Sequence, residues 1–293
     1  MATRTNRSRT IPPADPSAEE HRSGWSVNRP PSAWPRIDVR ELLAYRELAR
    51  ALAVRDLRVR YKQTFFGVAW AVLQPLTAVA IFTVVFGRVA RLPTDGSPYP
   101  IFVYAGMTMW LYLSASVSGA AQNLVSNREL VTKVFFPRLL APVAGVFPPL
   151  VDLAISLVIL GVFLAAYGIV PDPQFALLPL WVVAAMVLAL AVGLWLSALN
   201  VKYRDVRHVL PFLLQVWFFA SPVVYAGSSL DGLWRWVFAL NPAVALIDGF
   251  RWSVLSGPPP GPEGLVSLGV CLVLLVGGLA YFHRLERYFG DLI

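Results

Sequence analysis

The three lysines are the first place to look for a loop that binds nucleotide phosphates. Such a loop needs Gly immediately before its Lys, because backbone N–H groups wrap the phosphates while the ammonium group reaches them. The residues before the lysines are Tyr61, Thr132 and Val201. We therefore predict that this chain binds no ATP or Mg²⁺ by this route and carries no cofactor of its own.

Among the histidines and the carboxylates, one residue, Asp152, is a candidate for a functional role. His21, His208 and His283 offer no pair at metal-ligand spacing, so we predict no catalytic residue and no metal site. Asp152 interrupts a long apolar run, where an ionisable group is costly and usually faces a cavity or a partner. A position at the edge of a membrane span explains Asp152 equally well, because nearby prolines would start the helix later.

Aromatic rings are the third chemical feature, at 13% of the residues. Rings of Trp, Tyr and Phe stack on the apolar faces of sugar rings, and they also pack between helices. Both roles, lining a channel and packing, are open for the aromatic residues within or near the long apolar runs. These candidates are Trp70, Tyr104, Trp110, Tyr112, Trp217, Phe218, Phe219 and Tyr225.

A basic segment precedes the apolar runs. Between residues 37 and 63, apolar residues such as Leu48, Ala49 and Leu52 recur at three- and four-residue steps among arginines. The pattern predicts an amphipathic helix that lies on the membrane surface or docks on protein. Its last basic residues suit anionic headgroups; they are Arg55, Arg58, Arg60 and Lys62.

The composition requires lipid around these elements. Hydrophobic residues make up 57% of the 293 residues and charged residues only 14%, against roughly 25% in a soluble domain. The basic residues behind the net charge of +8 lie beside the apolar runs, so we predict contacts with membrane lipids and none with nucleic acid. Cys271 is the single cysteine, so no disulfide forms within one chain.

The apolar runs define the fold class. A membrane helix needs about 20 residues to cross roughly 30 Å of hydrocarbon. Six runs reach that length, so we predict an all-α integral membrane protein with six transmembrane helices. The runs extend over residues 63–87, 96–127, 139–171, 173–201, 209–230 and 264–283.

The remaining segments complete the domain organisation. Residues 1–36, rich in Arg, Pro and Ser, predict a disordered cytoplasmic tail, and residues 64–293 form the membrane domain. Between 231 and 263, two apolar pieces are too short to cross, which predicts short re-entrant or outer helices. With both termini inside, 21 of the 25 Lys and Arg residues are cytoplasmic, so we predict a multi-pass protein of the cytoplasmic membrane in that orientation.

Five strings stand out along the chain. They are FGVAWAVLQPL at 66–76, NRELVTKVFFPR at 127–138, NVKYRDV at 200–206, SPVVY at 221–225, and NP at 241–242 followed by GFR at 249–251. In this order and with six spans, they resemble the permease subunits of type-2 ABC exporters for cell-surface polysaccharide, O-antigen or teichoic acid. Glu129 departs from the resemblance, because a small or neutral residue is expected there.

The resemblance implies a site for coupling to a separate ATPase subunit. The second string would form a cytoplasmic coupling helix, in which an apolar knob rimmed by charge docks in a groove of the partner. The knob would consist of Leu130, Val134 and Phe135. Phe135 and Phe136 are expected to be exposed next to the charges, which a plain positive-inside loop would not explain. The predicted coupling residues are Arg128, Glu129, Leu130, Lys133, Phe135, Phe136, Pro137 and Arg138.

The resemblance also implies the assembly and the substrate. Two copies of this chain would pair with two nucleotide-binding subunits that bind ATP and Mg²⁺, and spans one and five would line a channel between the copies. The substrate would be a glycan on a polyprenyl diphosphate lipid, with the diphosphate near Arg55, Arg58, Arg60 and Lys62. The helices between 231 and 255 would form an outer gate. The chain would then be a transporter permease and not an enzyme.

Three alternatives stay open. A type-2 ABC permease for lipids or drugs would not need a wide aromatic passage. A membrane-bound glycosyl- or acyltransferase also handles polyprenyl lipids, but it needs convergent acid and base groups, and the apolar runs contain about one carboxylate. A passive membrane scaffold would form no stable complex with an ATPase.

Overall fold

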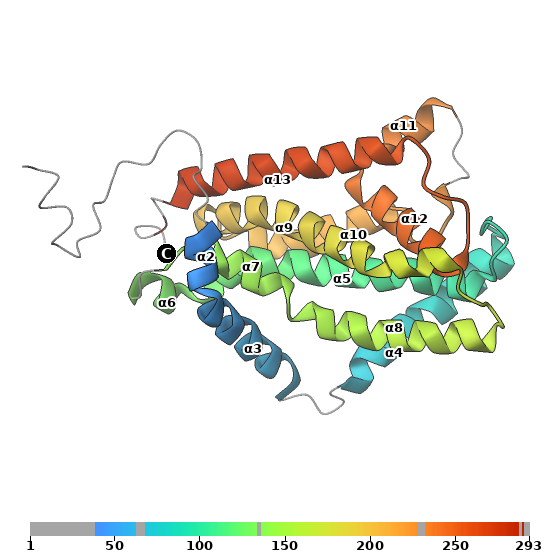
Figure 1. Cartoon of the computed structure of the whole chain (residues 1–293), viewed down its shortest axis with the longest axis horizontal. Coiled ribbons are helices and arrows are strands. Elements are labelled where there is room, and N and C mark those ends of the chain that lie inside the picture. Colours follow the sequence, from blue (N-terminus) through green and yellow to red (C-terminus); the bar gives the residue numbers. More distant parts are fainter. Residues whose placement is uncertain (1–38, 63–67, 134–135, 228–231, 287–288, 290–293) are drawn as a thin grey trace, which may run out of the picture. The chain divides into compact units, whose positions relative to one another are not determined.

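The computed structural model describes residues 39–62, 68–133, 136–227, 232–286 and 289. The predicted tail of residues 1–36 lies outside this part of the chain. Every regular element among the described residues is a helix, with no strand between them (Figure 1). The all-α prediction is therefore confirmed.

Five helical stretches are long and apolar enough to cross a membrane. They match the predicted first, second, third, fourth and sixth spans. The stretches are Ala69–Val89 (α4, Val68–Phe82, with the π-helix η1, Thr83–Val89), Tyr99–Ser126 (α5), Leu140–Ala166 (α7, Leu140–Val146, and α8, Pro149–Ala166), Pro173–Lys202 (the 3₁₀-helix η2, Pro173–Leu177, and α9, Leu178–Lys202) and Gly264–Glu286 (α13).

The predicted fifth span is shorter than expected. Its helix, α10, covers only the 14 residues Val206–Phe219, about 21 Å at 1.5 Å per residue. Pro222 has no N–H to continue the helix, and it disfavours helical backbone at Ser221 before it. The chain therefore turns after Phe219, and Ser221 and Val223 are buried. The structure supports five spanning helices, and the sixth crossing stays a prediction.

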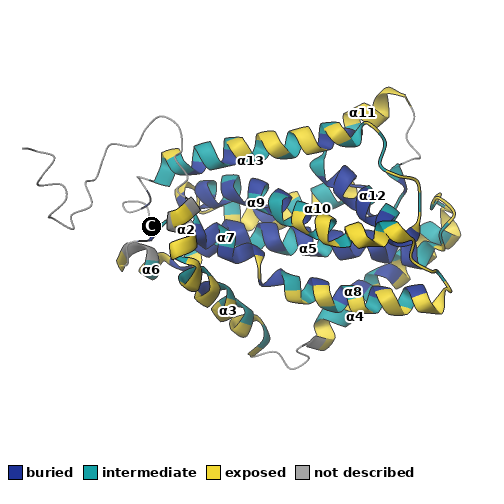
Figure 2. Cartoon of the chain, viewed as in Figure 1, coloured by how far each residue is buried: buried dark blue, intermediate teal, exposed yellow. Residues whose placement is uncertain are grey.

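Helix α5 is the centre of the bundle. In its most apolar window 78% of the residues are buried, against 11–28% in the other four stretches. It packs on α9, α7, α8, α12 and α4, and Figure 2 shows it in the buried colour while α8 and α13 expose residues outward. Such exposed apolar side chains suit surrounding lipid.

Small residues let α5 approach its neighbours closely. Gly119 of α5 faces Gly145 of α7 with so little space that a Cβ on either residue would overlap the backbone of the other. Gly193 of α9 packs against the methyl group of Ala120 of α5, which a Cβ on Gly193 would overlap. Membrane helices gain van der Waals contact through such crossings, because lipid provides no hydrophobic force between them.

The third span is broken at two prolines. Helix α7 ends at Val146 and α8 begins at Pro149, the residue after Pro148. Pro149 occupies the first helical position, where its missing N–H costs no hydrogen bond. Asp152 lies in the first turn of α8. Helix α8 therefore starts late in the third run, as expected if Asp152 lies at the edge of a membrane span.

The predicted amphipathic helix of residues 37–63 is present as two pieces, α2 (Val39–Ala44) and α3 (Arg46–Lys62). Leu52 is buried, and Leu48 and Ala49 pack against a core cluster that includes Leu140 and Phe282. This apolar stripe docks on protein, as one of the two predicted possibilities requires. Its contact with a membrane surface stays a prediction.

Short helices occupy the two ends of the bundle. Helix α6 (Arg128–Lys133) follows α5 at the end where α2 and α3 lie, and α11 (Leu233–Ala239) and α12 (Pro242–Leu255) lie at the other end (Figure 1). The short helices expected between 231 and 263 are therefore present. Their position relative to a membrane stays a prediction.

Candidate functional site

A cavity of about 770 Å³ lies beside α5. Its walls come from α3, α4, α5, α8 and α10. Two prolines inside helices, Pro75 of α4 and Pro211 of α10, are part of the wall. A proline inside a helix leaves the carbonyl four residues earlier without its helical partner. For Pro75 that carbonyl belongs to Ala71, which also lines the cavity.

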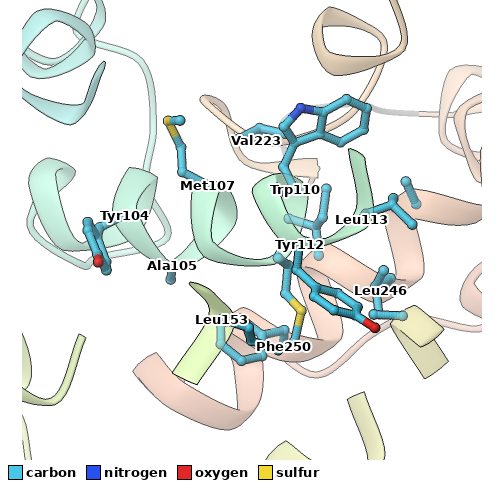
Figure 3. Packing of buried hydrophobic residues seen from close by; sticks show 14 of the residues in the cluster. Tyr104, Ala105, Met107, Trp110, Tyr112, Leu113, Leu153, Val223, Leu246 and Phe250 are labelled. Atoms are coloured by element: carbon cyan, nitrogen blue, oxygen red, sulfur yellow. The ribbon is translucent and has the colours of Figure 1, made fainter. Parts of the chain in front are cut away.

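Four of the eight predicted channel aromatics line this cavity: Trp70, Trp110, Tyr112 and Phe218. Trp110 and Phe218 make an edge contact with ring centroids 5.6 Å apart. Trp110 and Tyr112 leave α5 on different sides (Figure 3). Tyr112 is buried, and its hydroxyl donates to the carbonyl oxygen of Val146 at 3.3 Å.

The other four aromatics lie outside the cavity wall. Tyr104 is fully buried and donates to the carbonyl oxygen of Ser156 at 3.2 Å. Trp217 donates to the side chain of Asn241 at 2.8 Å, and Phe219 is 56% exposed on the outside of α10. The hydroxyl of Tyr225 donates to the carbonyl oxygen of Phe219 at 3.3 Å. These contacts account for Tyr104, Trp217 and Tyr225 as residues that hold the bundle together, whereas the ring of Phe219 is exposed outside the cavity.

Polar side chains of α5 face the same space, and the sequence reasoning missed them. Ser114 and Ser118 line the 770 Å³ cavity, and Ser118, Gln122 and Ser126 line a second cavity of about 540 Å³. The four residues follow each other at four-residue steps, which places them on one face of the helix. This four-residue spacing is visible in the sequence of residues 96–127 and could have predicted a polar face on the helix. We call these four residues the polar row.

The two cavities are neighbours. They share the lining residues Arg60, Ala115, Ser118 and Pro149. The smaller cavity is bounded by α3, by α5 and by the break between α7 and α8. A polar path therefore runs along α5 from the end that carries α3 and α6 into the larger cavity.

An ionic cluster stands where the two cavities meet. The guanidinium Nη2 of Arg60 lies 2.7 Å from Oδ2 of Asp152. The hydroxyl of Tyr61 donates to Oδ1 of the same carboxylate. Burial, together with this hydrogen bond and the carboxylate charge, raises the pKa of Tyr61 to about 12, so Tyr61 stays a donor at neutral pH. Asp152 thus faces a cavity and also has partners on α3.

A second polar cluster joins α3 to the end of α5. Asp56 accepts from Arg55 at 2.6 Å and from the side-chain amide of Asn123 at 2.8 Å. The amide of Asn127 donates in turn to the carbonyl and side-chain oxygens of Asn123. Both asparagines are buried. This series of hydrogen bonds ends at Asn127, the residue before α6. Arg58 and Lys62, the other two predicted basic candidates, are exposed on α3.

The predicted coupling segment is partly accessible. Arg128, Glu129 and Lys133 are exposed on α6, and Lys133 lies 3.8 Å from Glu129. Leu130 is half-buried against the core cluster that contains Leu140 and Phe282. Val134 and Phe135 lie outside the described residues.

The prediction that Phe136 is exposed beside the apolar knob is wrong. Only 4% of Phe136 is exposed, because the residue packs in the core cluster with Leu140 and Phe282. Pro137 is half-buried, and the guanidinium of Arg138 donates to the backbone carbonyl of Glu286. The second half of the segment therefore ties α7 to the end of α13.

A buried arginine organises the opposite end of the bundle. Arg251 is 5% exposed and donates to the carbonyl oxygens of Phe102 at 3.2 Å and Val223 at 2.5 Å. Its guanidinium also lies 3.8 Å from the ring centroid of Phe102 and 3.5 Å from Asp248. Gly106 leaves the space that the guanidinium fills. Two of the five strings, 221–225 and 249–251, thus meet at this contact.

Asn241 makes a similar connection. Its side-chain oxygen accepts from the backbone N–H of Ala243 at the start of α12, and its amide donates to Ala220 at 2.8 Å and Ser221 at 2.9 Å. Asn is well suited to this position because it caps the helix while its amide remains a donor. The strings at 221–225 and 241–242 are joined here.

These features define an α-helical membrane protein that encloses a polar and aromatic cavity and presents a charged helix at one end. The model of the ABC-2 type transporter family matches residues 47–255, so the chain belongs to that family. The family assignment agrees with the resemblance carried by the five strings.

Relatives with assigned roles share nearly their full length with this chain. An O-antigen export system permease protein, RfbA, of Myxococcus xanthus is 33% identical over 258 residues, which cover 87% of this chain and 98% of that protein. An RfbA of Klebsiella pneumoniae is 24% identical, covering 84% and 95%. The polysialic acid transport protein KpsM of Escherichia coli is 23% identical, covering 81% and 93%.

Proposed function

We propose that this chain is the permease subunit of an ATP-driven exporter that moves a polyprenyl-diphosphate-linked glycan across the cytoplasmic membrane. The observation that carries the proposal is the near full-length similarity to an O-antigen export permease at 33% identity. Other relatives are named for polysialic acid transport and capsule polysaccharide export. The family match and these names favour a polysaccharide over a drug or a free lipid.

The cavity walls suit a sugar chain. A pyranose ring presents apolar C–H faces and hydroxyl edges, so a passage for glycans needs both stacking surfaces and hydrogen-bonding groups. Trp70 and Phe218 offer rings on one part of the wall, with the buried Trp110 packed behind Phe218, and the polar row of α5 offers hydroxyl and amide groups on another. This combination supports the choice of glycan as the substrate.

Export requires an energy source from a second protein. We propose a nucleotide-binding ATPase subunit that binds ATP and Mg²⁺ and docks at the exposed charged residues Arg128, Glu129 and Lys133 of α6. Two copies of the chain would enclose the complete channel, with α4 and α10 at the junction. Both termini would then lie in the cytoplasm.

Two further assignments belong to the same proposal. Helix α10 and the buried turn after it form the sixth crossing together, since α10 alone is too short. Helices α11 and α12 act as the outer gate. The ion pair between Arg235 of α11 and Glu263, at 2.5 Å, would hold α11 in place.

The decisive experiment reconstitutes the chain and its ATPase subunit in proteoliposomes that contain a labelled lipid-linked glycan. We expect glycan to reach the opposite leaflet only with ATP, and only when both proteins are present. Export of a lipid or drug without movement of the glycan would establish the alternative permease function. Transfer of a sugar or acyl group by the isolated chain would establish an enzyme instead.

Matched aromatic variants test the passage. Trp70 of α4 is 60% exposed and lines the cavity, whereas Phe175 of η2 is 38% exposed and lies outside the cavity wall. We expect Trp70→Ala to lower the glycan export rate roughly threefold to tenfold, because it removes one stacking surface worth about 1 kcal/mol. Phe175→Ala should leave the rate within about twofold. Equal rates for both variants would contradict a stacking role for Trp70.

A further inference from the structure

Among the four basic residues predicted to bind a lipid diphosphate, Arg60 lines both cavities. Arg55 lines only the smaller cavity, and Arg58 and Lys62 belong to neither wall as the structure describes them. The Arg60 side chain therefore lies at the junction of the two cavities.

Arg60 already belongs to an anion site. Its guanidinium and the hydroxyl of Tyr61 converge on the two oxygens of Asp152. Asp152 lies in the first turn of the 18-residue helix α8, where the helix dipole favours negative charge. A guanidinium and a hydroxyl donor around one anion are the groups that also bind phosphate. The anion that occupies this site is the carboxylate of the chain itself.

The Arg60 side of the contact is open to exchange. The side chain of Arg60 is 44% exposed, so water screens its charge, whereas Asp152, 23% exposed with a buried Oδ2, is the more fixed partner. A diphosphate carries more negative charge and more acceptor oxygens than a carboxylate, and it matches the planar fork of arginine. It can therefore compete with Asp152 for Arg60.

We propose that Asp152 is a resident counter-ion, which holds Arg60 between the two cavities and releases it to a phosphate group of the arriving ligand. The ligand is a phosphate or diphosphate ester anion, as presented by a polyprenyl diphosphate or by an anionic phospholipid headgroup. The inference rests on the proposed function and adds a residue-level step to it. It gives Asp152 a role in admitting substrate.

Binding of a polyprenyl diphosphate to the full chain in phosphatidylcholine nanodiscs tests the exchange. We expect Asp152→Asn to tighten the Kd roughly threefold to tenfold, because it removes the competing charge and keeps the side-chain shape. Arg60→Gln should weaken the Kd about tenfold, and the double variant should match Arg60→Gln, since Asp152 acts by competing for Arg60. Arg50→Gln, an exposed arginine on the same helix that lines neither cavity, is the matched control and should bind as the wild type does.

A purely structural role for Asp152 makes the opposite prediction. Asp152→Asn would then bind the diphosphate more weakly or equally, and either result would overturn the exchange with a diphosphate. Asp152→Ser covers the case that Asp152→Asn fails to fold, because it removes the same carboxylate charge and leaves a small polar side chain in the first turn of α8. We expect it to tighten the Kd by a similar threefold to tenfold, and unchanged or weaker binding would decide against the exchange with a diphosphate.

A second arm separates the two phosphate sources. It measures retention of phosphatidylglycerol by the same variants in the absence of diphosphate. The expected variant order in the diphosphate arm supports a lipid-linked substrate, and that order in the phosphatidylglycerol arm alone supports a phospholipid headgroup. Loss of the order in both arms overturns the inference. The proposed function fails in a different way, through absent ATP-dependent export by the wild-type complex.

Discussion

Arg251 shows how a single buried charge holds irregular backbone in place. The turn after α10 has no helical hydrogen bonds to satisfy its carbonyl groups, and a buried carbonyl without a donor is costly. The guanidinium of Arg251 supplies donors to Val223 within the turn and to Phe102 in α5. The position of the turn therefore depends on a residue of α12.

Replacing Arg251 by Leu is expected to destabilise the folded protein by about 3 kcal/mol, because carbonyl groups and Asp248 lose a buried partner. Denaturant titration of the protein in detergent measures this loss in the free energy of unfolding. Arg235→Leu is the control, since the Arg235 side chain is 44% exposed and its pair with Glu263 is screened. Its expected cost is below about 1 kcal/mol. Similar costs for both variants would contradict the anchoring role of Arg251.

At the scale of helices, the crossing of α5 and α7 depends on two glycines. Gly119→Leu places a side chain where the backbone of Gly145 lies, so we expect a loss of about 1–3 kcal/mol or more from overpacking. Gly161→Leu in α8 is the matched control, because a Cβ there meets open space. Thermal melting of the two purified variants measures the difference. Equal melting temperatures would show that α5 and α7 are not closely packed in solution.

Helix α6 is held at both ends. The chain from Asp56 through Asn123 to Asn127 ties its beginning to α3, and Arg138 ties the segment after it to α13. Motion of α6 would therefore be transmitted to α3, which borders the smaller cavity. This arrangement suits an element that transmits force from an ATPase to a passage.

Lys133→Glu tests the contact of α6 with the ATPase. The change reverses an exposed charge and places it beside Glu129, so we expect ATP-dependent export to fall at least about threefold, while the folded protein remains as stable as the wild type. The measurement is export together with copurification of the ATPase subunit. Arg91→Glu, an exposed charge at the other end of the bundle, should leave both unchanged. Export that survives Lys133→Glu would place the docking surface elsewhere.

Orientation in the membrane is a property of the whole molecule, and single cysteines can measure it. Cys271→Ser provides the background, and Lys133→Cys and Pro259→Cys report on the two ends of the bundle, both at exposed positions. We expect a membrane-impermeant maleimide to label Pro259→Cys in intact cells and Lys133→Cys only after permeabilisation, as the distribution of Lys and Arg predicts. The reverse labelling pattern would invert the proposed topology.

The helices themselves could be predicted from the sequence. Apolar runs of sufficient length were enough to locate the first, second, third, fourth and sixth spans, because the free energy of transfer into lipid depends on local composition. The prolines in the third run also pointed to the late start of α8. Proline marked the end of α10 as well, yet run length alone suggested a longer helix through residues 209–230.

The inward and outward faces of those helices could not be predicted in the same way. Lipid and the protein interior are equally apolar, so the pattern of an apolar helix does not show whether Phe136 or Trp70 faces the core, a cavity or lipid. Phe136 proved to be buried and Trp70 exposed. The pairing of Arg60 with Asp152 joins residues 92 positions apart in the sequence. The sequence alone therefore determined the class of protein and the extent of most helices, whereas the cavity, its polar row and its ionic cluster exist only through the packing of α3, α5 and α8 against one another.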